Sequence, residues 1–355
     1  MFLTQLNLSQ FRHFPAFQLK PAAGFNFIFG PNGSGKSSLL EAIYVLSMGR
    51  SFRSKQLTPL IRHHCAEFQV IGSWKNIYDR QFTVGIGRQS QISDIRLDGQ
   101  PIHSLRDLVS LVPVQLINHE CFHLVDAGPQ CRREFLDWGV FHSEPSFFNA
   151  WQRYQRALKQ RNAGLKRHLP LAELNLWQQE LVLQAESIHA LRTHYFQGFL
   201  PHVERLLSEL LALDQLTIDY YPGWDVALPL ATVFNKDYER DCFLGHTQHG
   251  PHRADIKIKV KGIEADHLLS RGQQKLLSYT LRLAQSECLK MFTGKHSVLL
   301  IDDLAAELDG LKVEKVLQLL LNLNCQVFIT GVDESLVIAA AKAVHLTLFH
   351  VEHLS

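Results

Sequence analysis

Apolar residues change their spacing along this chain, and each spacing predicts a different kind of element. Short aromatic and β-branched runs, typical of strands, occur in 1–30, alternate through 67–99 and return at 111–118. Between 145 and 200 the apolar positions follow helical spacing, with a break predicted near 167–170. This pattern predicts a β-rich N-terminal lobe followed by two long helices folded into an antiparallel hairpin. After 241 the chain returns to α/β character, with buried strands expected at 256–260, 297–303 and 326–330.

A glycine-rich stretch follows the apolar run at 25–29 and precedes a helical pattern. Residues 30–37 read Gly-Pro-Asn-Gly-Ser-Gly-Lys-Ser and fit the phosphate-binding pattern G-x-x-x-x-G-K-[ST]. Glycines allow backbone N–H groups to surround a phosphate, and a helix N-terminus adds partial positive charge. We expect Lys36 to reach the β- and γ-phosphates of ATP and the Ser37 hydroxyl to bind Mg²⁺. The predicted nucleotide-binding residues of this loop are Gly30, Pro31, Asn32, Gly33, Ser34, Gly35, Lys36, Ser37 and Ser38.

Two carboxylates, Asp302 and Asp303, end a later buried strand, which is the expected partner of a phosphate loop. Asp302 is expected to position Mg²⁺, and Asp303 to orient or deprotonate the attacking water, so that Lys36 and Asp303 are the candidate catalytic residues. Asp302 lies 266 residues after Lys36. The nucleotide domain is therefore predicted to be split into 1–118 and 241–355 by an inserted helical arm at 119–240, with its hairpin at about 145–200.

Composition limits the class of protein. The 355 residues are enough for two or three domains, and no apolar run approaches the roughly 20 residues of a membrane span. We therefore expect a cytoplasmic protein without a membrane partner. The net charge of +2 does not indicate nucleic acid binding. Locally, the stretch 151–168 carries six basic residues and no acidic one, which fits either a solvated helix face or a phosphate-backbone contact surface.

Residues 269–273, Leu-Ser-Arg-Gly-Gln, resemble the signature sequence L-S-x-G-Q of ABC-type ATPases. Further stretches extend the resemblance over nearly the whole chain, to the RecF family of SMC-like ATPases. They are 30–38, Gly-Arg-Ser-Phe-Arg at 49–53, Gly-Pro-x-x-Arg-Arg-x-Phe-Leu-Asp at 128–137, and Gly-Pro-His-Arg-x-Asp at 250–255. The resemblance implies an α/β fold: an ABC-type, SMC-like P-loop ATPase head with a β-rich lobe and an inserted α-helical arm.

The resemblance also implies roles for residues outside the phosphate loop. In ABC-type ATPases the signature faces a nucleotide on a second subunit, which predicts an ATP-dependent head-to-tail homodimer. Ser270, Gly272 and Gln273 would face the partner's nucleotide, and Asp309 would be the residue that crosses the interface. Gln115 is the candidate for the Q-loop. Asp303 stands where SMC-type enzymes usually have Glu, which agrees with slow ATP turnover.

RecF-like proteins bind DNA at gaps or junctions when ATP-bound. They act with RecO and RecR to load RecA recombinase at single-stranded gaps, supporting replication restart and SOS induction. The resemblance therefore implies a weak, DNA-stimulated ATPase that uses ATP and Mg²⁺ as a switch.

Three other classes of protein fit the sequence less well. Another short-armed SMC-like ATPase acting on DNA ends would need a zinc-hook cysteine pair or longer heptads. A transporter-associated subunit does not explain the long helical insertion. A single-subunit P-loop enzyme, such as a metabolic kinase, would not need the signature.

Overall fold

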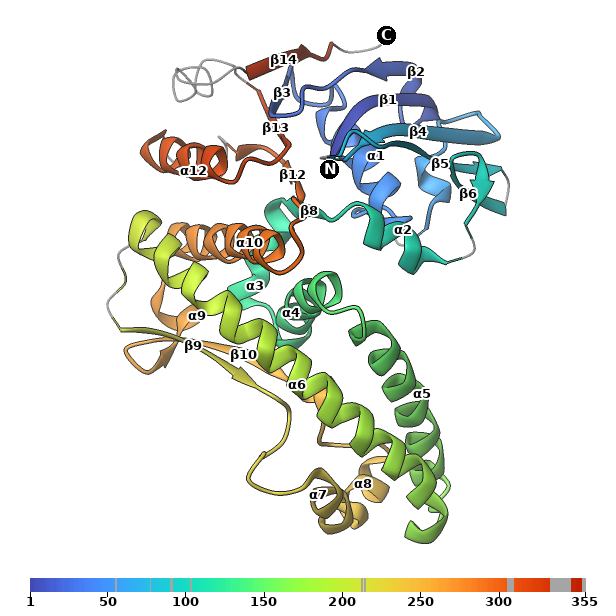
Figure 1. Cartoon of the computed structure of the whole chain (residues 1–355), viewed down its shortest axis with the longest axis vertical. Helices are drawn as coiled ribbons and strands as arrows, with labels where there is room; N and C mark the ends of the chain where they lie inside the picture. The colour runs from blue at the N-terminus through green and yellow to red at the C-terminus, as the bar shows by residue number, and fades with distance from the viewer. Residues whose placement is uncertain are drawn as a thin grey trace. The chain divides into compact units, whose positions relative to one another are not determined.

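The computed structural model describes residues 1–54, 56–76, 78–89, 92–102, 104–211, 213, 215–304, 310–332 and 346–352. The chain divides into two compact units, one formed by 1–121 with 289–355 and the other by 122–288. The division begins close to the expected insertion at 119 but ends at 288 rather than 240. The ribbon of each unit is drawn in Figure 1. The assignment of 241–288 to the ATPase domain stays a prediction.

The first unit contains a five-stranded parallel sheet in the order β14-β3-β13-β12-β8. Its strands are β3 (Phe25–Phe29), β8 (Val114–Ile117), β12 (Val298–Ile301), β13 (Val327–Gly331) and β14 (Leu346–His350). Every residue of β12 and β13 is buried, as expected where a parallel sheet is covered on both faces. The predicted strands at 25–29, 111–118, 297–303 and 326–330 are confirmed, and all meet in this sheet.

A six-stranded antiparallel sheet, in the order β2-β1-β4-β5-β6-β7, forms the β-rich lobe. Its strands are β1 (Phe2–Phe11), β2 (Phe14–Leu19), β4 (Glu67–Lys75), β5 (Gln81–Gln89), β6 (Ile92–Leu97) and β7 (Gln100–Pro101). Alternate side chains of β4 point inward, among them Phe68, Val70 and Trp74. The same core cluster contains Leu39 and Ile43 of helix α1 (Lys36–Met48), so α1 packs against this sheet.

Helix α1 also packs against the parallel sheet, because its cluster includes Ile28 of β3 and Leu300 of β12. Ten of its 13 residues are buried, which explains why its apolar pattern covers more than one face. The remaining elements of this unit are η1 (Thr58–Leu60), α2 (Leu105–Leu111) and α12 (Gly310–Asn322); η2 (His119–Phe122) lies at the boundary. The phosphate loop thus connects a central strand to a helix held between two sheets.

The second unit is built on the helix hairpin α5 (Phe147–Lys166) and α6 (Leu171–Leu210) (Figure 1). The helices run antiparallel, since Gly164 lies against Leu174 near the turn while Arg153 pairs with Glu180 farther away. A Cβ at Gly164 would lie 2.4 Å from Leu174 Cδ2, so glycine permits this close approach. The predicted break falls at 167–170, between the two helices.

Shorter elements complete the second unit. They are α3 (His123–Asp126), α4 (Pro129–Ser143), β9 (Leu216–Tyr221), α7 (Leu230–Lys236), α8 (Tyr238–Leu244), η3 (Pro251–Arg253), β10 (Asp255–Val260), β11 (Ile263–Glu264) and α9 (Ala265–Leu268). Strand β10 lies between β11 and β9 in an antiparallel sheet. Helix α10 (Arg271–Thr293) follows and runs past the boundary at 288.

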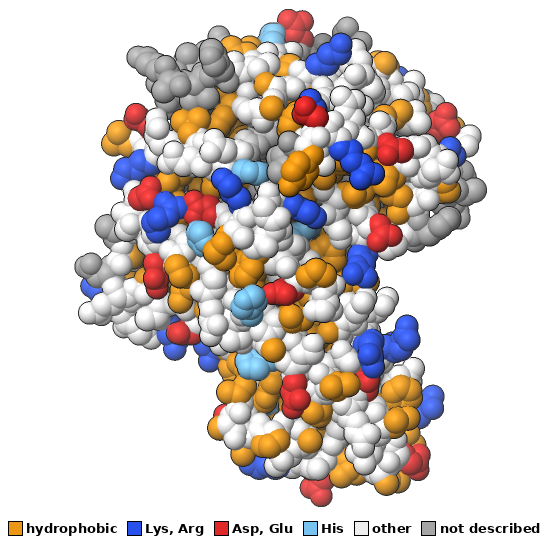
Figure 2. Space-filling model, in the orientation of Figure 1, with side chains coloured by type: hydrophobic (Ala, Val, Ile, Leu, Met, Phe, Trp, Pro, Cys, Tyr) orange, Lys and Arg blue, Asp and Glu red, His pale blue; other side chains and the backbone are white. Residues whose placement is uncertain are grey.

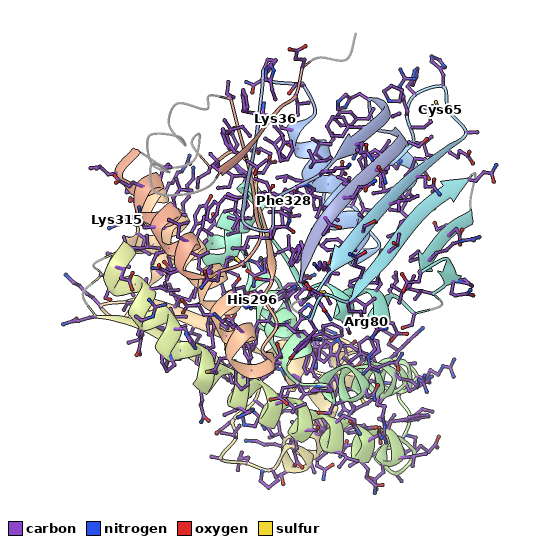
Figure 3. The ribbon with its side chains drawn as sticks, turned by 45° about the horizontal axis from the view of Figure 1, so that its top comes forward. Lys36, Cys65, Arg80, His296, Lys315 and Phe328 are labelled. Atoms are coloured by element: carbon purple, nitrogen blue, oxygen red, sulfur yellow. The ribbon has the colours of Figure 1, made fainter. Side chains whose placement is uncertain are left out.

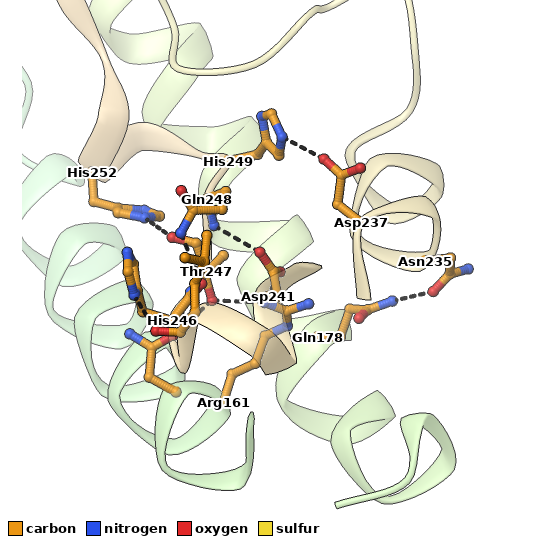
Figure 4. A network of polar contacts seen from close by, with 12 residues as sticks. Arg161, Gln178, Asn235, Asp237, Asp241, His246, Thr247, Gln248, His249 and His252 are labelled. Atoms are coloured by element: carbon orange, nitrogen blue, oxygen red, sulfur yellow. Dashed lines mark hydrogen bonds and ion pairs between the residues drawn. The ribbon is translucent and has the colours of Figure 1, made fainter. Parts of the chain in front are cut away.

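A buried polar network fixes α5 to the segment that precedes β10 (Figure 4). Arg161, fully buried, donates to Asp241 Oδ2 and to Thr247 Oγ1, each at 2.7 Å. Two turns earlier in α5, the Tyr154 hydroxyl lies 2.6 Å from His252 Nδ1, and His252 Nε2 lies 3.0 Å from the Thr247 carbonyl oxygen. Because a carbonyl only accepts, Nε2 carries the hydrogen and Nδ1 accepts from the tyrosine. Burial lowers the pKa of His252 to about 4, which favours this neutral form.

Within the described part of the chain, no helix combines the length and apolar character needed to cross a membrane.

Candidate nucleotide-binding site

The phosphate loop occupies residues 30–35, between the end of β3 and the start of α1. Its backbone demands glycine at Gly35, where φ is +104° and a Cβ would lie 2.0 Å from His13 Cε1. Gly30 has φ +151°, and a Cβ there would lie 2.1 Å from the Val351 carbonyl oxygen. The chain therefore passes too close to neighbouring groups for any side chain at these two positions.

A cavity of about 300 Å³ opens beside this loop. Figure 3 marks Lys36 near the top of the view, with Phe328 of β13 below it. Four of the expected loop residues with side chains line the cavity, and so do both carboxylates at the end of β12. The lining residues are His13, Asn32, Gly33, Gly35, Lys36, Ser37, Ser38, Arg53, Asp302, Asp303 and Thr330. The sequence prediction that the loop and the acidic strand end meet is thus matched by the structure.

Lys36 is folded back onto its own loop. Its Nζ donates to the carbonyl oxygens of Gly30 and Pro31, at 2.7 and 2.9 Å. Burial lowers the pKa of Lys36 from its ordinary value, an effect opposed by the carboxylates of Asp303 and Asp302. A partly desolvated ammonium beside a loop of backbone N–H groups gains favourable interactions when a phosphate enters.

The ends of α1, β12 and β13 are joined by a chain of hydroxyl–carboxylate hydrogen bonds. Asp302 Oδ1 accepts from Ser37 Oγ at 2.8 Å and from Thr330 Oγ1 at 2.7 Å. The same Thr330 hydroxyl accepts from the Asp303 backbone N–H at 2.9 Å. Hydroxyl and carboxylate oxygens are the ligands that Mg²⁺ prefers, so Ser37 and Asp302 fit that ion.

Asp303 has a left-handed backbone, with φ +55°. This conformation is uncommon for residues other than glycine and asparagine-like ones, and it requires support from neighbours. The hydrogen bond from its N–H to Thr330 supplies such support. The backbone of the candidate catalytic residue is therefore held by a hydrogen bond to the adjacent strand β13.

Arg53 reaches the cavity through the motif at 49–53. The motif is anchored by Glu41, a fully buried carboxylate of α1 that binds Arg12 through two hydrogen bonds of 2.8 and 2.6 Å. The Ser51 hydroxyl donates to Glu41 Oε1 and accepts the N–H of Arg53 at 2.9 Å. The loop that carries Arg53 is thereby tied to the helix of the phosphate loop.

Three lining residues were not assigned a role from sequence. His13 lies between β1 and β2, with Nε2 3.0 Å from the Ser34 carbonyl oxygen, and nothing in the sequence marks it. Arg53 belongs to a quoted motif that had no stated role. Thr330 lies within β13, one residue before the end of that strand, and its place at the site follows from its hydrogen bond to Asp302.

Other predicted residues lie elsewhere. Gln115 is buried within β8, in register with Leu299, and does not line the cavity. Ser270, Gly272 and Gln273 belong to the second compact unit, whereas the residues that line the cavity belong to the first. Ser270 is exposed and caps α10: its hydroxyl accepts the Gln273 N–H at 3.3 Å, and Gln273 Oε1 accepts the Ser270 N–H at 2.9 Å. Asp309 lies outside the described residues.

Known proteins resemble this chain over almost its full length. A family model described as the RecF/RecN/SMC N terminal domain matches residues 2–353. The DNA replication and repair protein RecF of Vibrio parahaemolyticus is 41% identical over 352 residues, which is 99% of this chain and 98% of that protein. The protein of the same name from Pseudomonas aeruginosa strain LESB58 is 42% identical over 356 residues, 99% and 96% of the two chains.

Solved structures agree with these relatives. A structure of the recombination mediator protein RecF-ATPrS in the RecFOR pathway matches with a TM-score of 0.86 and 27% identity, covering 99% of this chain and 96% of that one. An Smc head bound to the C-winged helix domain of ScpA shares the fold, with a TM-score of 0.59 at 14% identity, covering 96% of this chain and 92% of the other. The predicted ABC-type, SMC-like head with a helical arm is confirmed, and the chain belongs to the RecF family.

Proposed function

We propose that this chain is an ATP-dependent DNA-binding protein of recombinational DNA repair, in which ATP joins two copies head to tail. The observation that carries the proposal is that the phosphate loop, Asp302 and Asp303 line one cavity of the first unit, as a site for a nucleoside triphosphate requires. In the second unit, the capped N-terminus of α10 begins at the exposed Ser270. The names of the relatives and of the solved RecF structures support the choice of ATP and DNA.

Different residues of the cavity would serve the binding of ATP and its hydrolysis. The loop N–H groups and Lys36 would hold the triphosphate, and Ser37 and Asp302 would hold Mg²⁺, which neutralises phosphate charge when bound. Asp303 would orient the attacking water and accept its proton. Its carboxylate is one methylene shorter than that of Glu, which supports slow turnover and a switch rather than a fast enzyme.

A second copy would complete the site with its signature. The N-terminus of a 23-residue helix carries partial positive charge, and the exposed Ser270 lies at that end of α10 with the half-buried Gly272 and Gln273. Asp309 would cross the same interface, and Gln115 is retained as the Q-loop proposal. In this arrangement 1–118 and 241–355 act as one ATPase domain, with 119–240 as its arm.

Slow hydrolysis would release the dimer from gaps or junctions in DNA. We place the protein in the cytoplasm, where it would help RecO and RecR load RecA recombinase at single-stranded gaps, and so support replication restart and SOS induction. This role extends the description of the solved RecF structures as a recombination mediator protein in the RecFOR pathway.

The proposal is tested by molar mass in solution, measured by light scattering with ATP and with ADP. Wild type should form a dimer with ATP alone. Ser270→Arg should bind a fluorescent ATP analogue as wild type does and stay monomeric, because a bulky cation blocks the signature. Ser208→Arg, which changes an exposed serine on α6, is the matched control and should dimerise normally. A wild type that is monomeric in every condition would instead favour a single-subunit P-loop enzyme.

A further inference from the structure

Four cations stand on the outward face of α5. Arg156, Lys159, Lys166 and Arg167 are exposed, whereas Tyr154 and Arg161 of the same helix are buried on its inner face. Steps of 3, 10 and 11 residues from Arg156 keep the four within one stripe of a helix with 3.6 residues per turn. We call these four residues the α5 stripe. Figure 2 shows blue side chains along the lower right-hand edge of the view, the region in which Figure 1 draws α5.

Within the described residues, no carboxylate forms an ion pair with the stripe. Helix α5 itself contains no Asp or Glu between 147 and 166. The elements packed against α5 are α4, α6 and α8, which carry the carboxylates Glu134, Asp137, Glu173, Glu180, Glu186, Glu204, Glu209, Glu239 and Asp241. Of these, Asp137 binds Arg192, Glu180 binds Arg153, Glu209 binds Arg205 and Asp241 binds Arg161. Like charges without such partners repel one another along a helix.

The helix dipole accounts for the position of two cations of the stripe but not for the position of the other two. Lys166 and Arg167 lie at the C-terminal end of α5, where cations interact favourably with the helix dipole. Arg156 and Lys159 lie in the middle of the helix and gain nothing from its ends. The repulsion between these two cations is offset when a polyanion binds, so substitution of this pair gives the clearest test of the stripe.

The face is suited to a duplex backbone rather than to single-stranded bases. Arg156 and Arg167 are separated by about 16 Å along the axis, or roughly five base-pair steps of one strand. From residue 152 onward, the exposed uncharged positions of α5 are Gln152 and Gln155, before the stripe, and Gln160 and Ala163, between its cations, and they offer no aromatic surface for stacking. The aromatic Tyr154 is buried, and Trp151 lies against the Arg192 guanidinium.

The helix is also held rigidly, which reduces the entropy lost on binding. Arg161 and Tyr154 attach its inner face to the 241–252 segment, as described above. Arg192 of α6 binds Asp137 of α4 and the Pro251 carbonyl oxygen, so the second helix of the hairpin is also joined to α4 and to η3. A charged surface on such a support presents its cations in a constant geometry.

We propose that the α5 stripe binds the phosphate backbone of duplex DNA, independently of base sequence. This inference rests on the proposed function, because it names the surface through which the arm would contact DNA. It resolves the choice left open by the sequence in favour of a contact surface over a solvated face.

The test is the salt dependence of binding to a labelled 30-base-pair duplex, measured by fluorescence anisotropy with ATP between 50 and 200 mM NaCl. Arg156→Gln with Lys159→Gln should reduce the slope of log K against log salt by about 2 for each arm engaged. The variant should therefore lose about tenfold less affinity than wild type across this range. The control replaces Arg153 and its partner together, Arg153→Gln with Glu180→Gln, and should leave the slope unchanged.

Each outcome decides the inference. An unchanged slope in the stripe variant, with wild type binding DNA, overturns the stripe while leaving the proposed function intact. Loss of affinity for a single-stranded oligonucleotide but not for the duplex overturns the assignment to duplex DNA. Failure of wild type to bind either DNA with ATP overturns the proposed function and the stripe together. Light scattering with ATP on every variant separates loss of dimerisation from loss of DNA contact.

Discussion

Ser37 Oγ lies 2.8 Å from Asp302 Oδ1, although 265 residues separate the two in sequence. The hydrogen bond joins the first turn of α1 to the end of β12, and Thr330 adds the end of β13 through the same carboxylate oxygen. One oxygen atom, Asp302 Oδ1, therefore links the start of α1, the end of β12 and β13 through hydrogen bonds. Substitutions at this point are expected to affect nucleotide binding and local stability together.

Lys36→Ala should abolish nucleotide binding and with it the ATP-dependent dimer, because the loop loses its ammonium. Binding of a fluorescent ATP analogue and molar mass with ATP are the two measurements. Lys20→Ala, which removes an exposed lysine of the same unit, should change neither. A Lys36→Ala protein that still dimerises with ATP would remove the phosphate role given to Lys36.

Asp303→Asn should accumulate a dimer that retains ATP, because the amide cannot accept the proton of the attacking water. The lifetime of the dimer after removal of free ATP should lengthen relative to wild type, as followed by light scattering. If the variant stays monomeric with ATP, Asp303 serves binding or structure rather than hydrolysis.

Thr330→Val should lower the free energy of unfolding by about 1–3 kcal/mol and slow ATP hydrolysis. The change keeps the shape but leaves the Asp303 N–H without its 2.9 Å acceptor and Asp302 without one donor. Thr330→Ser retains the hydroxyl and should recover most of both losses. Denaturant unfolding and phosphate release measure the two effects, and equal behaviour of the valine and serine variants would refute the role of the hydroxyl.

His252 should make the second unit less stable in mild acid. Burial lowers its pKa from about 6.5 to about 4. Between these two pH values the histidine is protonated in the unfolded chain and neutral in the folded chain. The contribution is fully present above pH 6.5 and is lost as the pH falls toward 4, with an upper limit of about 3 kcal/mol. Urea unfolding at pH 7.0 and 4.5 should therefore show a larger loss for wild type than for His252→Gln.

His267→Gln is the control for this pH dependence, because His267 is an exposed histidine of the same unit. It should leave the difference in unfolding free energy between the two pH values as in wild type. An equal difference in wild type and His252→Gln would show that the 6.5-to-4 window belongs to other groups.

Periodicity and motif spacing were sufficient for the elements that local sequence determines. The phosphate loop needs glycines at fixed positions, the α10 cap needs Ser270 with Gln273 three residues later, and the hairpin break needs Pro170. Each of these signals lies within a few residues of the structure it specifies. The meeting of the loop with Asp302 was also predictable, because both patterns belong to one known arrangement.

Residues that act through long-range packing could not be found in this way. His13 reaches the loop only because the turn between β1 and β2 lies beside Gly35. Arg53 depends on the buried contact between Glu41 and Arg12, which lie 29 residues apart. Gln115 lies in the strand that the sequence predicts at 111–118, but its burial and its place outside the cavity lining depend on how β8 packs, which a single sequence does not display.

The order of strands around β3 has a consequence for synthesis of the protein on the ribosome. Strand β3 leads into the phosphate loop, yet its two neighbours are β13 and β14, and Asn26 bonds with Val327 across 301 residues. A nascent chain thus exposes a finished nucleotide-loop sequence long before it can build the sheet that supports it. Nucleotide binding should begin only after about 300 further residues have left the exit tunnel, because β13 and β14 must be present before β3 has its neighbours.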